Sequence, residues 1–75
     1  MAFFRSRARR ELDSLIEEIE INLANNYKDV AHDARRRLGR RVEELYADGK
    51  LKEKHYRAYR ARFETYTQIM RDYHH

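Results

Sequence analysis

The residues best suited to chemistry in this 75-residue chain are five arginines that lie within seven positions. Guanidinium groups bind phosphate through paired hydrogen bonds, and tyrosines elsewhere in the chain could stack on nucleobases. The cluster consists of Arg35, Arg36, Arg37, Arg40 and Arg41. It predicts either a nucleic-acid-binding face or a solvated face on which the flanking arginines pair with glutamates of the first helix. A binding face would be contiguous and free of carboxylates.

Two aspartate–histidine pairs have the i, i+3 spacing of ligands in helical metal sites. They are Asp29 with His32 and Asp72 with His75. A di-metal bundle needs Glu-x-x-His on two helices and further glutamates, and this chain has no such repeat. It has no cysteine and no glycine-rich phosphate loop, and its serines, Ser6 and Ser14, lie in charged helical sequence. We therefore expect no metal, no cofactor, no small-molecule substrate and no enzymatic activity.

The composition favours helices. The chain has no proline, only two glycines and 40% charged residues, which suits thin amphipathic helices with wide solvated faces. Its length allows one small helical domain, residues 1–75. No apolar run is long enough to span a membrane, and the first residues lack the apolar core of a signal peptide. We expect a cytoplasmic, soluble protein without a membrane partner.

Apolar residues recur at helical spacing through most of the chain. The first stripe consists of Leu12, Leu15, Ile16, Ile19 and Leu23, and it extends back to Ala8 and Phe4. Asn25-Asn26 then predicts a turn, with Asn26 as the N-cap and Asp29 as the third residue of a second helix. The second stripe consists of Tyr27, Val30, Ala31, Ala34, Leu38, Val42 and Leu45. Because the spacing runs almost unbroken through the asparagines, one continuous helix from about residue 9 to residue 47 is the alternative.

Residues 42–56 predict a second turn and the start of a third helix. Gly49 follows the last apolar position of the second helix, where a left-handed residue commonly closes a helix. Lys52 is the expected N-cap, which makes Leu51 and Tyr56 the N′ and N4 residues of a hydrophobic staple. The third stripe consists of Tyr56, Tyr59, Phe63, Tyr66, Met70 and Tyr73. We expect a bulky member of this stripe to approach Gly39 closely.

These patterns predict an all-α fold, a small three-helix antiparallel bundle with up-down-up topology. The alternative is one long helix and a shorter one that form a hairpin and dimerise. Residues 1–8 are basic, and we expect them to be an N-terminal arm that frays, because arginines oppose the dipole at a helix start. Such an arm either contacts phosphate or an acidic surface, or is simply solvated.

The hairpin at residues 42–63 resembles the SHOCT module, a short C-terminal helical hairpin, in Gly49, Leu51 and the later Tyr56. Lys52 stands where that module usually has serine or threonine. More broadly, the chain is similar to short bacterial helical proteins of unknown function. That similarity lies in Ile19 to Leu23, Asn25-Asn26-Tyr27-Lys28-Asp29, Gly49-Lys50-Leu51 and Asp72-Tyr73-His74. It implies a three-helix fold and no assigned activity.

We therefore expect a non-catalytic protein-interaction module that binds another protein or a second copy of itself. A small core without disulfide or metal motivates the self-association. The expected interface residues are Ile21, which lies off the first stripe, and Tyr59 and Tyr66 of the third stripe. The alternative function is an accessory nucleic-acid-binding protein that uses the arginine cluster.

Overall fold

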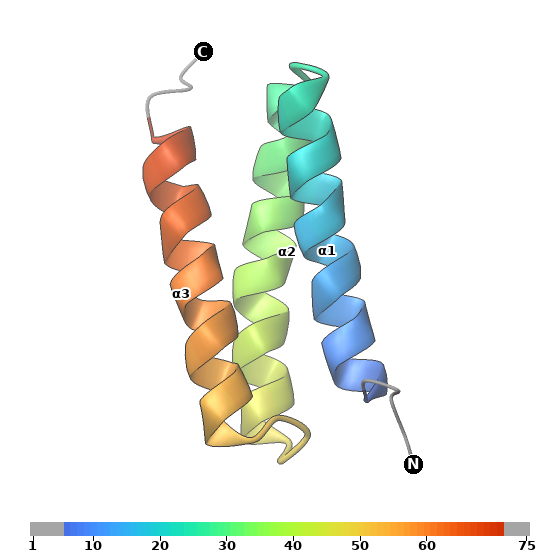
Figure 1. Cartoon of the computed structure of the whole chain (residues 1–75), viewed down its shortest axis with the longest axis vertical. Helices are drawn as coiled ribbons and strands as arrows, with labels where there is room; N and C mark the ends of the chain where they lie inside the picture. Colours follow the sequence, from blue (N-terminus) through green and yellow to red (C-terminus); the bar gives the residue numbers. More distant parts are fainter. Residues whose placement is uncertain (1–5, 72–75) are drawn as a thin grey trace.

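A computed structural model describes residues 6–71 and shows three α-helices joined by two short turns (Figure 1). The helices are α1 (Arg7–Ala24), α2 (Lys28–Ala47) and α3 (Glu53–Met70). α1 packs against α2 and α2 packs against α3, in an up-down-up arrangement that is 44 Å long. The predicted three-helix all-α bundle is confirmed. The alternative of one continuous helix through the asparagine pair is wrong.

The first turn is closed by Asn26, whose backbone is left-handed with φ at 62°. The Tyr27 amide donates to the carbonyl of Asn22 at 2.8 Å. The Asn26 amide donates to the carbonyl of Leu23 at 3.1 Å, which completes a Schellman cap at the end of α1. Our prediction that Asn26 caps the start of α2 is therefore wrong. Tyr27 takes that position without a side-chain hydrogen bond, and Asp29 is the second helical residue instead of the third.

The second turn repeats this geometry around Gly49, whose φ is 74°. The Lys50 amide donates to the carbonyl of Leu45 at 2.8 Å, and the Gly49 amide donates to Tyr46 at 3.0 Å. The left-handed conformation predicted for Gly49 is confirmed. Lys52 is the N-cap of α3, as predicted, and its side chain makes no capping hydrogen bond.

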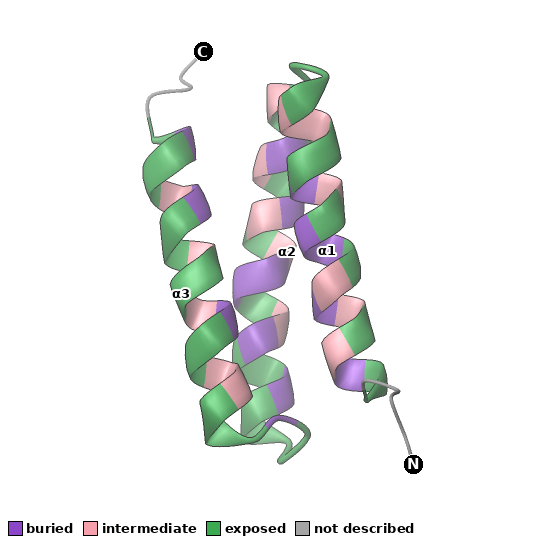
Figure 2. Ribbon diagram, viewed as in Figure 1, coloured by how far each residue is buried: buried purple, intermediate pink, exposed green. Residues whose placement is uncertain are grey.

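The core is a set of buried side chains on the faces that the helices turn toward one another (Figure 2). α1 contributes Ala8, Leu12, Leu15, Ile16 and Ile19, and α2 contributes Ala31, Ala34, Leu38, Val42 and Leu45. The second turn contributes Leu51, and α3 contributes Tyr59, Tyr66 and Met70. Tyr27 and Val30, which we predicted to face the core, are exposed. They differ because α2 begins only after the left-handed Asn26, so its helical phase is not continuous with that of α1.

The start of α1 lies earlier in the chain than predicted. Ser6 is its N-cap, and the Ser6 hydroxyl accepts a hydrogen bond from the Arg9 amide at 3.2 Å. Ala8 is buried in the core. Residues 7 and 8 therefore belong to α1, and the prediction of a fraying arm that reaches residue 8 is wrong. Phe4, Tyr73 and the Asp72–His75 pair lie outside the described residues.

Candidate functional site

The arginine cluster lies on α2, and two of its members bridge to the acidic side of α1. Arg41 donates two hydrogen bonds to the Glu11 carboxylate, from Nε at 2.5 Å and from Nη2 at 2.9 Å. Arg37 donates to Glu18 at 2.9 Å. The hydrogen bonds from Arg41 lower the pKa of the Glu11 carboxyl. The carboxylates of α1 therefore neutralise the side of the cluster that lies nearest to them.

The other three arginines of the cluster lie on two further sides of α2. Arg36 and Arg40 are exposed, and each lies within 4 Å of a carboxylate on α2, at 3.8 and 3.9 Å. Arg35 turns toward α3, where it donates a hydrogen bond to the Thr67 hydroxyl at 3.3 Å. The cluster is therefore divided among several sides of α2 and contains carboxylates. It is not the contiguous, acid-free face expected of a nucleic-acid binder.

A groove of about 560 Å³ lies between α1 and α2 beside these ion pairs. Its charged lining residues are Glu11, Glu18, Glu44, Arg37, Arg40 and Arg41. Three carboxylates and three guanidinium groups give this lining no net charge. The groove therefore favours neither an anionic nor a cationic ligand.

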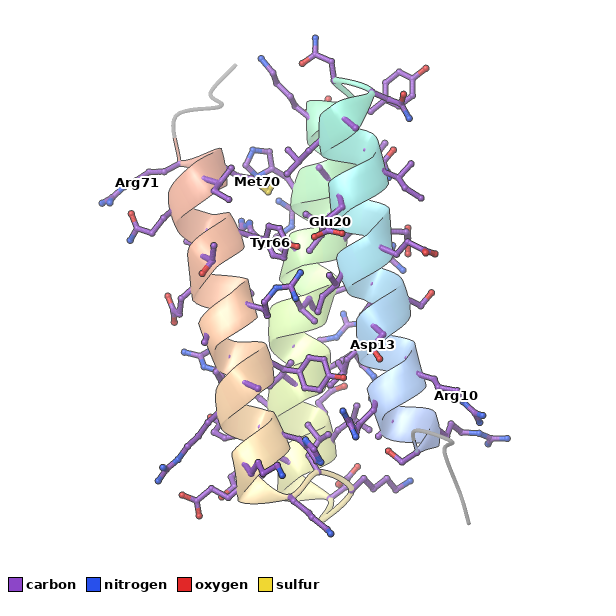
Figure 3. All side chains as sticks on the ribbon, in the orientation of Figure 1. Arg10, Asp13, Glu20, Tyr66, Met70 and Arg71 are labelled. Atoms are coloured by element: carbon purple, nitrogen blue, oxygen red, sulfur yellow. The ribbon has the colours of Figure 1, made fainter. Side chains whose placement is uncertain are left out.

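Tyrosine hydroxyls connect α3 to α1. The Tyr59 hydroxyl donates to Asp13 at 2.7 Å. The Tyr66 hydroxyl donates to Glu20, and Figure 3 shows these two side chains pointing toward one another between α3 and α1. Arg62 donates to the same Glu20 carboxylate at 3.0 Å. Burial raises the pKa of Tyr59 and of Tyr66, and the hydrogen bonds to carboxylates raise each pKa further.

Tyr59 and Tyr66 are therefore part of the fold and do not form an exposed interface. Their side chains are only 6% and 5% exposed. The prediction that they offer an interaction surface is wrong, because their rings fill the core and the acids of α1 satisfy their hydroxyls. Ile21, the third predicted interface residue, is 53% exposed.

Ile21 belongs to an end of the bundle that carries little charge. Most of the large apolar side chains that are exposed lie at this end: Ile21, Tyr27 (61% exposed), Val30 (48%) and Ile69 (45%). We call these four residues the neutral end. The neighbouring stretch of residues 21–31 contains only two charged side chains, Lys28 and Asp29, which cancel. In a chain with 40% charged residues, such a stretch is a distinct surface.

Three members of the neutral end were missed by the sequence patterns. Tyr27 and Val30 were assigned to the core because they continue the apolar spacing of α1. Ile69 was not singled out, since it lies beside the third stripe and not within it. The low charge of residues 21–31 is the signal in the sequence that would have indicated this surface.

Within residues 6–71, no group of three or more histidine, aspartate or glutamate side chains is arranged to hold a metal ion. No helix in the described part of the chain is long and apolar enough to cross a membrane. No protein-family model matches the chain, and neither a curated protein nor a solved structure matches it significantly. The resemblance of the 42–63 hairpin to the SHOCT module stays a prediction.

Proposed function

We propose that the protein is a non-catalytic interaction module that pairs with a second copy of itself through the neutral end. The observation that carries the proposal is the gathering of exposed apolar side chains and low charge at one end of a densely charged chain. Interface cores are depleted of charged residues and enriched in aromatic ones. Ile21, Tyr27 and Val30 have the properties of such a core.

A second copy is the partner that the properties of the chain favour. A bundle of 75 residues without cysteine has a small core, and burial of the neutral end would stabilise it. Lys28 and Asp29 have opposite charges. A twofold axis at this end can therefore place Lys28 of each copy beside Asp29 of the other. A specific interface of about 1,000 Å² needs about 500 Å² from each copy, roughly a tenth of the 5461 Å² surface.

The proposal includes a cytoplasmic location, which suits a chain without cysteine. The arginine cluster gives little support to nucleic-acid binding as the main function. Its guanidinium groups lie beside carboxylates, and binding to phosphate would have to compete with these pairs.

Sedimentation equilibrium across the micromolar range tests the proposal. The wild-type chain is expected to pass from monomer to dimer as its concentration rises. Val30→Lys places a charge in the neutral end and is expected to weaken the dimer by at least about tenfold, which corresponds to roughly 1.4 kcal/mol. Ala61→Lys adds the same charge at an exposed position of α3, two helical turns from Ile69, and is the matched control. A monomer at every concentration, or equal effects of the two variants, would overturn the proposal.

A further inference from the structure

A group of basic residues lies at the end of the bundle opposite the neutral end. Arg7, Arg9 and Arg10 lie in the first turn of α1. Lys50, Lys52 and Lys54 lie in the second turn and the first residues of α3. We call these six residues the basic end. The start of α1 and the second turn lie at the same end of the molecule (Figure 1).

A buried residue anchors each of the two segments of the basic end in the core. Ala8 and Leu51 belong to the same core cluster, and each is flanked directly by basic residues on both sides. The Tyr59 hydroxyl oxygen of α3, which donates its proton to Asp13, also lies 3.4 Å from the carbonyl oxygen of Arg9. The charged side chains beside these anchors therefore project from one end of a packed core.

Most charges of the basic end have no carboxylate partner among the described residues. Arg7, Arg10 and the three lysines make no ion pair with any described residue. Figure 3 shows Arg10 pointing away from the bundle. Residues 6–10 and 48–54 contain six cations and two carboxylates, a net charge that equals the +4 of the whole chain. The rest of the chain is neutral overall, so the positive field is concentrated at this end.

We propose that the basic end binds the phosphate backbone of nucleic acid without reading its base sequence. Duplex DNA carries about one negative charge per 1.7 Å of its axis, so the 23 Å width of the bundle spans more than ten phosphate charges. Lysine binds phosphate as a point charge and arginine binds it with a fork of donors. Neither requires contact with a base edge, and the contacts position the protein on the backbone alone.

Two other anionic partners suit the basic end less well. Stable attachment to a membrane takes an apolar anchor in addition to a polybasic patch. Near this end the large exposed apolar side chain among described residues is Tyr46, and its ring is stacked on Tyr56 with centroids 4.0 Å apart. A protein interface would favour aromatic residues at its centre, whereas lysine is depleted from interfaces and supplies half of this patch.

Fluorescence anisotropy of a labelled DNA duplex of about two helical turns tests the proposal, from about 50 to about 200 mM NaCl. The wild-type chain is expected to bind at the lower salt and to lose about a hundredfold or more in affinity at the higher salt. The triple variant Lys50→Gln, Lys52→Gln, Lys54→Gln is expected to bind at least about tenfold more weakly, and its salt slope should be smaller by about 2 to 3. Circular dichroism melts check that the triple variant is folded. If it is not folded, the double variant Arg7→Gln, Arg10→Gln replaces it in the binding measurements.

The matched control is Arg36→Gln, Arg40→Gln, Arg71→Gln, which removes the same charge from exposed positions away from the basic end. Its affinity is expected to stay within about threefold of wild type. Absence of duplex binding at the lower salt, or equal losses in both triple variants, would overturn the proposal. Cosedimentation with phosphatidylserine vesicles in the absence of duplex binding would assign this end to membranes and would also overturn it. The basic and neutral ends are separated along the 44 Å length of the bundle, so a failure of one proposal leaves the other standing.

Discussion

Gly39 of α2 lies directly against the ring of Phe63 on α3, so close that a Cβ atom on Gly39 would come within 2.6 Å of Cε1 of the ring. Two guanidinium groups flank the same ring, Arg35 at 5.7 Å and Arg60 at 5.3 Å from its centroid. The close approach that the sequence predicted for Gly39 is confirmed. It gives a physical reason for a glycine in the middle of a helix, where glycine is otherwise unfavourable.

Gly39→Ala is expected to destabilise the protein by about 1 kcal/mol. Alanine adds roughly 1 kcal/mol of helix propensity, but the crowded ring must move, and overpacking typically costs about 1–3 kcal/mol. Denaturant melts measure the difference. As a control, Gly39→Ala is also made in the Phe63→Leu variant, where the smaller side chain leaves room for the Cβ atom. There the substitution should increase the free energy of unfolding. A gain in stability from Gly39→Ala alone would show that the ring moves away at little cost.

Gly49→Ala is expected to destabilise the protein by about 1–2 kcal/mol through the backbone alone. No atom lies within 4 Å of a Cβ added to Gly49, but its φ of 74° is unfavourable for a residue with a side chain. Asn26→Gly is the matched change at the equivalent position of the first turn, and it should alter the free energy of unfolding by less than about 1 kcal/mol. A neutral result for Gly49→Ala in the same melts would contradict this account of the turn.

The sequence predicted the number and order of the helices and most of their buried faces, because apolar spacing, glycine and asparagine act locally. It predicted the left-handed Gly49 for the same reason. It assigned the wrong role to Asn26, since asparagine suits both an N-cap and a left-handed helix end. Because Asn26 was predicted to be an N-cap, Tyr27 was assigned to the core, whereas the residue is exposed.

The surfaces were harder to predict because they depend on which helices become neighbours. Pairing of Arg37 and Arg41 with glutamates of α1 was one of two interpretations, and only the packing of α1 on α2 decides between them. The basic end joins two segments that are about forty residues apart, and no local pattern shows that they meet. Burial of Tyr59 likewise depends on an acid of α1 that lies far away in the sequence.

Ile16→Ala is expected to destabilise the protein by about 2–5 kcal/mol, as large-to-small changes in a core do. Ile16 is buried in the core cluster. Ile21→Ala removes the same atoms from an exposed position of the same helix and should change stability by less than about 0.5 kcal/mol when the protein is monomeric. Denaturant melts at low protein concentration compare the two. Similar losses in both variants would mean that the core face of α1 is misplaced.

Stability is expected to fall at alkaline pH partly through Tyr66. Burial raises the pKa of Tyr66 in the folded state, whereas the unfolded chain loses this proton near its ordinary pKa of about 10. The contribution is therefore complete below about pH 10 and is lost as the pH rises through the folded-state pKa. Denaturant melts at pH 8 and at about pH 11 should show that the free energy of unfolding falls less between these pH values for Tyr66→Phe than for wild type. Identical pH dependence in the two proteins would show that Tyr66 is not responsible.

The central claim, pairing through the neutral end, is tested most directly by distances between copies. The chain has no cysteine, so single spin labels can be attached at Asn25→Cys, beside the neutral end, or at Lys54→Cys, in the basic end. Double electron–electron resonance measures the distance between the two labels of a dimer. The labels at position 25 should lie closer together than the 44 Å length of one bundle, and the labels at position 54 should lie farther apart than that length. Short distances between the Lys54 labels, or no intermolecular signal from the Asn25 labels at high concentration, would contradict the claim.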